Sequence, residues 1–215
     1  NVWQEGVEMN FGVNDENIGK YAIKSFVAAT KALKEGFVDV LVTAPINKYN
    51  IQSDNFKFPG HTDYLDQELE GNALMLMVQD GLRVGLLTDH IPLNEVASHL
   101  TEELIIKKIE TIKQTIIQDF SINKPKIAVL GLNPHCGDGG VIGKEEDAVL
   151  KPTLKKIFDK GTLVFGPFAA DGFFGSNQYD KYDAIIATYH DQGLIPFKTL
   201  SFGNGVNYTA GLIKI

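Results

Sequence analysis

The sequence contains a single cysteine, Cys136, among its 215 residues. One cysteine excludes an internal disulfide framework and is typical of a protein kept in a reducing compartment. The opening segment NVWQEGVEMN has no basic region followed by an apolar one, so it does not match a secretion signal. We therefore expect an intracellular, cytoplasmic protein.

Long apolar runs and clusters of basic residues are also absent. The longest apolar stretches have the length of a strand, well short of the roughly 20 residues that a membrane-spanning helix needs. Asp and Glu (27) outnumber Lys and Arg (20), which gives a net charge of −7. A nucleic acid or an anionic membrane would require a basic face, so neither is expected as a partner.

Short apolar runs alternate with amphipathic segments along the chain, and this alternation predicts an α/β protein with a mostly parallel sheet flanked by helices. The tight turn Asp80-Gly81 predicts a local antiparallel hairpin near residues 73–88. Asn14 or Asp15 can cap a first helix that ends near Glu35. The strands are predicted at 38–43, 73–78, 82–87, 126–132, 163–165, 184–188 and 206–212.

Further helices are predicted by capping residues and by helix breakers. Thr62 is a candidate N-cap for a short helix, and Thr101 is a candidate internal cap or kink in a helical region from about Asn94 to Phe120. Pro152 should kink or divide a helix over residues 144–159.

Three histidines follow directly on predicted buried strands: His90, His135 and His190. In open α/β sheets, ligands bind outside the carboxyl ends of the strands, so these side chains can converge although they are far apart in sequence. Neutral imidazole is the commonest metal ligand, and three histidines leave coordination positions open for a substrate. The pattern predicts a catalytic divalent cation. His99 falls inside a helical pattern and is interpreted as a surface or packing residue.

Other polar residues near the strand ends have two interpretations each. Cys136 could be a fourth metal ligand, although a small side chain packed in the glycine-rich loop is the stronger interpretation. Lys48 and Lys198 either bind an anionic substrate group or are solvated. Three aspartates could transfer protons, support a metal ligand or cap turns, and the best candidate is the one next to His190. These aspartates are Asp138, Asp171 and Asp191.

Five segments then point to a family. They read VTAPINK, FPGHTDYL, GLNPHCGDGG, YHDQGLIPFK and FGNGVNYTAGL. Their order and sequence closely resemble the 4-hydroxythreonine-4-phosphate dehydrogenase family of pyridoxal phosphate biosynthesis, across essentially the whole chain. The resemblance implies a fold like that of isocitrate and isopropylmalate dehydrogenases.

The resemblance also implies an activity. The family enzyme oxidises the secondary hydroxyl of 4-phosphohydroxy-L-threonine with NAD, or NADP, and the resulting β-keto acid loses carbon dioxide to give 3-amino-2-oxopropyl phosphate. It implies a homodimer with a divalent cation (Zn, Mg or Co) at the subunit interface. Related family members act on phosphothreonate or phosphorylated tetronates, so a dehydrogenase of such a hydroxy acid is an alternative. An inactive metal- or phosphate-binding fragment is another.

Site residues carry over one by one from this resemblance. The metal ligands fall on His90, His135 and His190. Substrate contacts fall on His61, Thr62, Lys198 and Asn207, and we expect Lys198 and Asp191 to take part in catalysis. The cofactor-binding residues are not identified.

The resemblance also sets expectations for the organisation of the chain. Family members have a further N-terminal portion and a substrate-binding arginine beyond Ile215, so we expect a partial dehydrogenase chain. Residues from about 38 to 125 would form a central region for dimerisation and for substrate and metal binding. Residues from about 126 to 215 would form a C-terminal α/β region.

Overall fold

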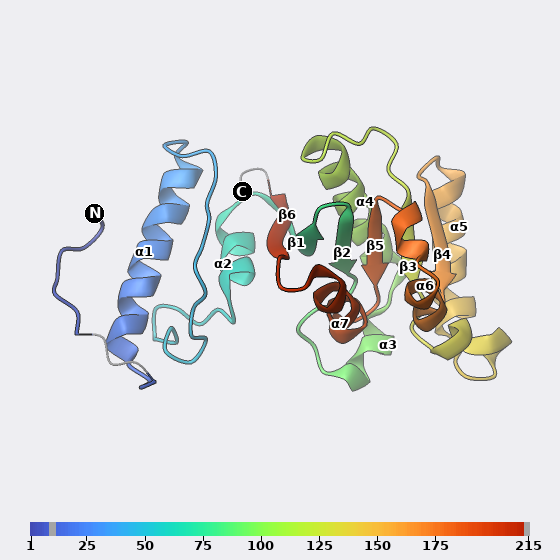
Figure 1. Cartoon of the computed structure of the whole chain (residues 1–215), viewed down its shortest axis with the longest axis horizontal. Coiled ribbons are helices and arrows are strands. Elements are labelled where there is room, and N and C mark those ends of the chain that lie inside the picture. The colour runs from blue at the N-terminus through green and yellow to red at the C-terminus, as the bar shows by residue number, and fades with distance from the viewer. Residues whose placement is uncertain (9–11, 213–215) are drawn as a thin grey trace. The chain divides into compact units, whose positions relative to one another are not determined.

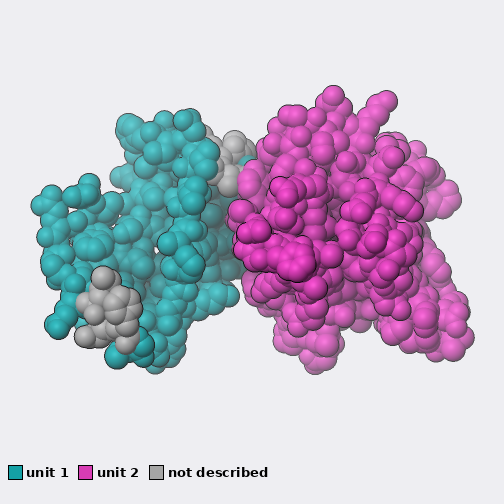
Figure 2. Space-filling view, viewed as in Figure 1, with its two compact units in different colours: residues 1–73, 212–215 teal, residues 74–211 magenta. Residues whose placement is uncertain are grey.

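The computed structural model describes residues 1–8 and 12–212. The chain divides into two compact units (Figure 2). Unit 1 comprises residues 1–73 and 212–215, and unit 2 comprises residues 74–211. The division at residue 73 falls inside the region that we expect to serve dimerisation, and the role of that region stays a prediction.

In the described part of unit 1, the helices are α1 (Glu16–Lys34) and α2 (His61–Glu68). The side chain of Asp15 accepts a hydrogen bond from the backbone of Asn17, so the predicted cap of the first helix is confirmed. The N-cap of α2 is Gly60, with no side-chain hydrogen bond, so the predicted cap at Thr62 is wrong. A cluster of buried apolar side chains, including Phe26, Leu33 and Tyr64, forms the core of the unit.

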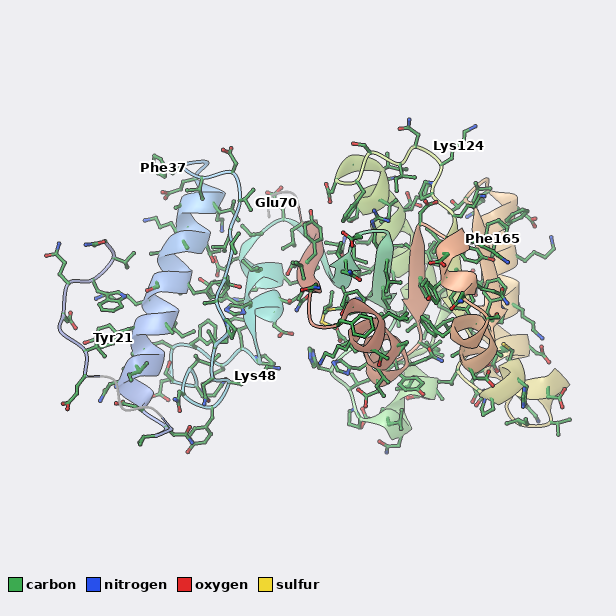
Figure 3. All side chains as sticks on the ribbon, in the orientation of Figure 1. Tyr21, Phe37, Lys48, Glu70, Lys124 and Phe165 are labelled. Atoms are coloured by element: carbon green, nitrogen blue, oxygen red, sulfur yellow. The ribbon has the colours of Figure 1, made fainter. Side chains whose placement is uncertain are left out.

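The predicted strand over residues 38–43 does not form. Val40 and Val42 are 65% and 88% exposed. An apolar run becomes a strand only where a neighbouring strand accepts and donates its backbone hydrogen bonds. Within residues 1–8 and 12–212, no such neighbour pairs with this segment. The preceding residue, Phe37, is also exposed (Figure 3).

Unit 2 is built on a mixed sheet with the strand order β4-β3-β5-β2-β1-β6 (Figure 1). Strands β2, β5, β3 and β4 are parallel neighbours, and β1 and β2 form the predicted antiparallel hairpin, with Leu76 opposite Gly85. The α/β prediction is confirmed. The strand bounds are β1 (Gly71–Gln79), β2 (Leu82–Leu86), β3 (Ile127–Leu130), β4 (Val164–Phe168), β5 (Ala184–Ala187) and β6 (Val206–Leu212).

Helices cover both faces of this sheet, which buries the central strands completely. One face packs on α4 (Glu102–Gln118) and α5 (Lys151–Asp159), and the other packs on α6 (Ala170–Gly175) and α7 (His190–Ser201) (Figure 1). Short helical turns complete the unit. These are η1 (Leu93–Glu95), α3 (Val96–His99), η2 (Pro134–Gly140), the π-helical turn η3 (Glu146–Leu150) and η4 (Gln178–Lys181).

One predicted helix break is confirmed in unit 2, and the other is a change of helix type. Thr101 separates α3 from α4, and its hydroxyl accepts a hydrogen bond from the backbone of Leu104. Pro152 directly follows the π-helical turn η3, and the backbone stays right-handed helical at Leu150 and Lys151, so the helical region over residues 144–159 changes from π-helix to α-helix at the proline. Proline removes one backbone donor, and a local π-helical turn is a common way for a helix to accommodate such a change.

Gly193 determines how closely α7 approaches the sheet. A β-carbon at this position would lie 2.9 Å from Cδ2 of Leu86 and 3.0 Å from Cβ of Ala187. Glycine at this position therefore lets α7, which begins at His190, pack closely on Leu86 and Ala187. Along the part of the chain that the structure describes, no helix is both long and apolar enough to cross a membrane.

Candidate metal and substrate site

The structure brings together two of the three predicted metal ligands. The ring centres of His90 and His190 lie 5.6 Å apart, with an angle of 44° between the ring planes. His90 follows β2, and His190 follows β5, which is its parallel neighbour. The strand-end argument is confirmed for this pair.

Hydrogen bonds continue past the ends of these two strands. The backbone N–H of Leu87 donates to the carbonyl of Ala187, and that of Thr88 donates to the carbonyl of Thr188. The Thr88 hydroxyl donates to the same Thr188 oxygen over 2.7 Å. Both threonines are buried, so the backbone two residues before each histidine is held firmly.

Asp191 contacts His190 directly. Its Oδ1 lies 2.7 Å from Nδ1 of the imidazole, and the Asp191 side chain is 70% exposed while that of His190 is 35% exposed. A carboxylate at Nδ1 fixes the tautomer in which Nδ1 carries the proton and Nε2 keeps its lone pair. Nε2 is therefore the nitrogen of His190 that can bind a metal.

A pocket of about 320 Å³ opens beside the two histidines. Its polar groups come from the ends of β2 and β5, and its apolar groups come from η1, α3 and the segment before them. The lining residues are Asp89, His90, Ile91, Leu93, Val96, Tyr189, His190 and Asp191.

His135 lies in a turn with unusual backbone geometry. All six residues from 135 to 140 have positive φ, including His135 (52°), Cys136 (53°) and Asp138 (45°). A left-handed backbone costs a non-glycine residue roughly 1–2 kcal/mol, so the surrounding structure must hold this turn in place. We call residues 135–140 the left-handed turn.

Glu146 holds one side of the left-handed turn. Its side chain is fully buried, and its carboxylate accepts hydrogen bonds from the backbone N–H of Asn133 (2.7 Å) and from the Asn133 side chain (2.9 Å). A β-carbon at Gly137 would lie 2.9 Å from Oε2 of Glu146 and 2.5 Å from the carbonyl oxygen of Gly143. No sequence pattern predicts this role for Glu146, because an acidic residue in the first turn of a helix is usually solvated.

The three histidines do not form a complete ligand set within one chain. Among residues 1–8 and 12–212, no group of three or more His, Cys, Asp or Glu side chains is arranged to hold a metal ion. His135 is exposed on its turn, and its role as a third ligand stays a prediction.

The His90 and His190 pair nevertheless fits a shared cation. A metal about 2.1 Å from one nitrogen of each ring would separate the ring centres by roughly 5 Å, close to the observed spacing. The Asp191 contact leaves Nε2 of His190 available. The donor set of two imidazoles suits Zn or Co better than Mg, which prefers oxygen ligands.

Lys198 and Asn207 are the predicted substrate contacts in unit 2, and both are exposed. Lys198 lies near the end of α7, which begins at His190. A rise of about 1.5 Å per residue separates these two positions by about 12 Å along the helix axis.

In unit 1, His61 and Thr62 are the first two residues of α2. The ring of His61 packs edge-on against Phe26, with 4.8 Å between ring centres, and burial lowers the pKa of this imidazole. The side chain of Lys48 is exposed (Figure 3).

Cys136 is half-buried in the left-handed turn, and its thiol donates a hydrogen bond to the carbonyl of Pro167 over 3.4 Å. Burial raises the pKa of this thiol, and the nearby charge of Glu146 raises it further. These contacts favour the packing interpretation over a role as a metal ligand, because metals bind the thiolate.

Comparison with known proteins identifies the family. The family model described as pyridoxal phosphate biosynthetic protein PdxA matches residues 1–215. The chain belongs to the PdxA family. A 4-hydroxythreonine-4-phosphate dehydrogenase from Bacteroides thetaiotaomicron is 48% identical over 214 residues, which is 99% of this chain and 59% of the relative.

Solved structures of similar proteins share the fold. The crystal structure of 4-hydroxythreonine-4-phosphate dehydrogenase from Klebsiella pneumoniae superposes with a TM-score of 0.82 at 34% identity, over 95% of this chain and 62% of the other. A terephthalate 1,2-cis-dihydrodioldehydrogenase from Burkholderia xenovorans gives a TM-score of 0.69 at 26% identity, over 91% and 62% of the two chains. This chain thus spans about three fifths of the length of the relatives described here.

Proposed function

We propose that this PdxA chain is part of an NAD-dependent, metal-assisted dehydrogenase. It would oxidise 4-phosphohydroxy-L-threonine at its secondary hydroxyl, with transfer of hydride to NAD or NADP and release of a proton. The β-keto acid would then lose carbon dioxide to give 3-amino-2-oxopropyl phosphate. Family membership supports a dehydrogenase of pyridoxal phosphate biosynthesis. The main observation that supports this site is the proximity of the His90 and His190 rings, with Asp191 hydrogen-bonded to His190.

His90 and His190 would hold the divalent cation, with His135 as the third ligand. A bound divalent cation lowers the pKa of a hydroxyl and polarises a carbonyl, which are the two demands of this reaction. The ring spacing and the available Nε2 support the first two ligands. The absence of a third ligand beside them, within the described residues, is compatible with a site completed at a subunit interface. We therefore propose a homodimer.

Asp191 and Lys198 would act around this pair. Asp191 keeps the proton of His190 on Nδ1 and orients the ring. The exposed side chain of Lys198 would stabilise, as an ammonium group, negative charge that develops on the substrate; in its neutral amine form it would instead take up the hydroxyl proton. Asn207, exposed on β6, would donate a hydrogen bond to the substrate.

His61 and Thr62 would bind an anionic group of the substrate. They open α2, and the first N–H groups of a helix favour negative charge. We further propose that the whole protein has the architecture of isocitrate and isopropylmalate dehydrogenases and works in the cytoplasm. The resemblance of the five sequence segments supports the architecture, and the single cysteine is typical of a reducing compartment such as the cytoplasm.

The test measures NADH absorbance after mixing the chain with NAD, 4-phosphohydroxy-L-threonine and Zn, Co or Mg, with metal content determined in parallel. His190→Ala should abolish turnover and reduce metal retention. His99→Ala is the matched control, because His99 lies on α3 and its Nδ1 bonds to the nearby Glu95 carbonyl over 2.8 Å. Wild-type metal content and turnover in His190→Ala would reject the assignment.

A second candidate is a dehydrogenase of a related hydroxy acid. The resemblance to a structure named as a dihydrodiol dehydrogenase supports this second candidate, because that protein shares the fold and is named for a different substrate. Phosphothreonate and a phosphorylated tetronate belong in the same assay, and faster turnover of either one would replace 4-phosphohydroxy-L-threonine as the substrate. Cation binding without NAD reduction by any of them would favour a binding module.

A further inference from the structure

The side chain of Gln192 links two neighbouring parallel strands beyond their ends. Its Oε1 accepts hydrogen bonds from the backbone N–H of Thr188 (2.7 Å) and from the Thr188 hydroxyl (2.8 Å). Its Nε2 donates to the carbonyl of Gly131 over 2.6 Å. Thr188 follows β5, Gly131 follows β3, and Gln192 lies in the first turn of α7.

These bonds replace backbone pairing at the point where the strands separate. The last recorded pair between β3 and β5 is Val129 with Ile186. Beyond it, Gly131 donates its own N–H to Phe168, on the opposite side of β3. The carboxamide of Gln192 pairs the two backbone groups that face the gap, because an uncharged amide carries both an acceptor and a donor.

The linkage extends to the third strand. The carbonyl of Thr188 accepts from both the N–H and the hydroxyl of Thr88, which follows β2. The ends of β2, β5 and β3 are thus connected in one buried or half-buried hydrogen-bond network. His90 and His190 each follow a threonine of this network by two residues.

We propose that Gln192 is a positioning residue for the metal site. It sets the separation between the strand ends that carry His90 and His190 and the strand end that leads to the left-handed turn with His135. Its carboxamide bonds to Thr188 and Gly131, so it would act through the strand ends and not as a ligand. This inference rests on the proposed function for its consequence, but the linkage between the strand ends can be measured without any metal.

The experiment compares the wild-type chain with Gln192→Met, which keeps the length of the side chain and removes all three hydrogen bonds. Gln192→Glu is the second variant, because it keeps the acceptor toward Thr188 and loses the donor toward Gly131. Ile109→Val is the stability control. It removes one methyl group from the α4 core on the other face of the sheet and is expected to destabilise the protein without altering the strand ends.

The first measurement is hydrogen exchange of the metal-free chain. In Gln192→Met, exchange should rise at Thr188 and across residues 131–136, and Ile109→Val should show no such local rise. In Gln192→Glu, protection of the Thr188 amide should persist while residues 131–136 exchange faster. Unchanged exchange at both segments in Gln192→Met would overturn the proposal.

The second measurement is a Co²⁺ titration followed by visible absorption. Partners that orient metal ligands typically change affinity by about 10- to 100-fold, so the Kd for Co²⁺ should rise by that factor in Gln192→Met and stay within about twofold in Ile109→Val. Equal affinity in the two variants would also overturn the proposal. If the wild-type chain binds no Co²⁺, the proposed metal site fails, and a local rise in exchange would still support the linkage of the strand ends.

Discussion

The phenol oxygen of Tyr208 lies 3.0 Å from Oδ2 of Asp119, 89 residues earlier in the chain. Tyr208 belongs to β6, Asp119 caps the end of α4, and the Tyr208 ring packs edge-on against Phe120. The guanidinium of Arg83 lies over the Phe120 ring, 4.5 Å from its centre. This cluster connects the antiparallel end of the sheet to the helix that covers it.

Tyr208 should make the stability of the protein depend on alkaline pH. Burial, assisted by the charge of Asp119, raises the pKa of Tyr208 from 10.0 to about 12. The stabilising contribution is complete below pH 10 and is lost as the pH rises toward about 12, because the unfolded chain loses the proton first. In Tyr208→Phe this loss should be absent, while stability at neutral pH falls by about 1 kcal/mol. Urea unfolding across this pH range measures both effects, and parallel pH curves for the two proteins would contradict the assignment.

The left-handed turn predicts unequal effects of two glycine substitutions. Gly137→Ala should destabilise the protein by several kcal/mol, because its β-carbon would overlap the Gly143 carbonyl and the Glu146 carboxylate. Gly139→Ala is the matched control. Its φ is also positive, but no atom lies within 4 Å of the added carbon, so the cost should be about 1 kcal/mol. Thermal unfolding of the two variants should separate them clearly, and equal melting temperatures would show that the turn is not held in this geometry.

His61 should make unit 1 sensitive to acid. Because burial lowers the pKa of this imidazole from its ordinary 6.5, the folded state resists protonation. Its contribution is complete above pH 6.5 and is lost as the pH falls through the lowered pKa. His61→Gln should reduce the loss of unfolding free energy on acidification, while α1 and α2 remain helical. Circular dichroism during urea unfolding at several pH values tests this, and an unaltered acid dependence in the variant would rule out His61 as its source.

The thiol of Cys136 should react slowly in the native protein. Its raised pKa reduces the thiolate fraction at neutral pH, and its Sγ contacts the carbonyl of Pro167. Iodoacetamide should therefore label the native chain much more slowly than the same chain in denaturant. Cys136→Ala provides the blank, since no other cysteine is present. Equal labelling rates in the native and denatured states would indicate an open, mobile left-handed turn.

Much of the fold could be predicted from local patterns. Apolar runs predicted strands β2, β3, β5 and β6, and the Asp80-Gly81 turn predicted the hairpin. Asp15 and Thr101 cap their helices through contacts only two or three residues away, so these caps could also be predicted. The segment at 38–43 has the same apolar pattern, but strand formation depends on a neighbour that the pattern does not contain. The predicted cap at Thr62 is wrong because α2 already begins at His61, one residue earlier.

The site could be predicted only where it follows from topology. Parallel neighbours end at the same edge, and this placed His90 beside His190 without any knowledge of side-chain contacts. The position of His135 depends on a left-handed backbone that Glu146 supports from a later helix, and the local sequence does not predict six consecutive residues with positive φ. The hydrogen bond from Gln192 to Gly131 spans 61 residues, so it too arises only in the folded chain.

The left-handed turn also constrains which sequences this chain can tolerate. β-Branched side chains are the least compatible with such a backbone, and Gly, Asn and Asp are the most compatible. A library randomised over residues 135–140 and selected only for folding should be enriched in these compatible residue types, and histidine should not be retained at position 135. Selection for metal binding should then be needed to recover the histidine. The comparison would show which residues of the turn are required for its backbone and which are required for its chemistry.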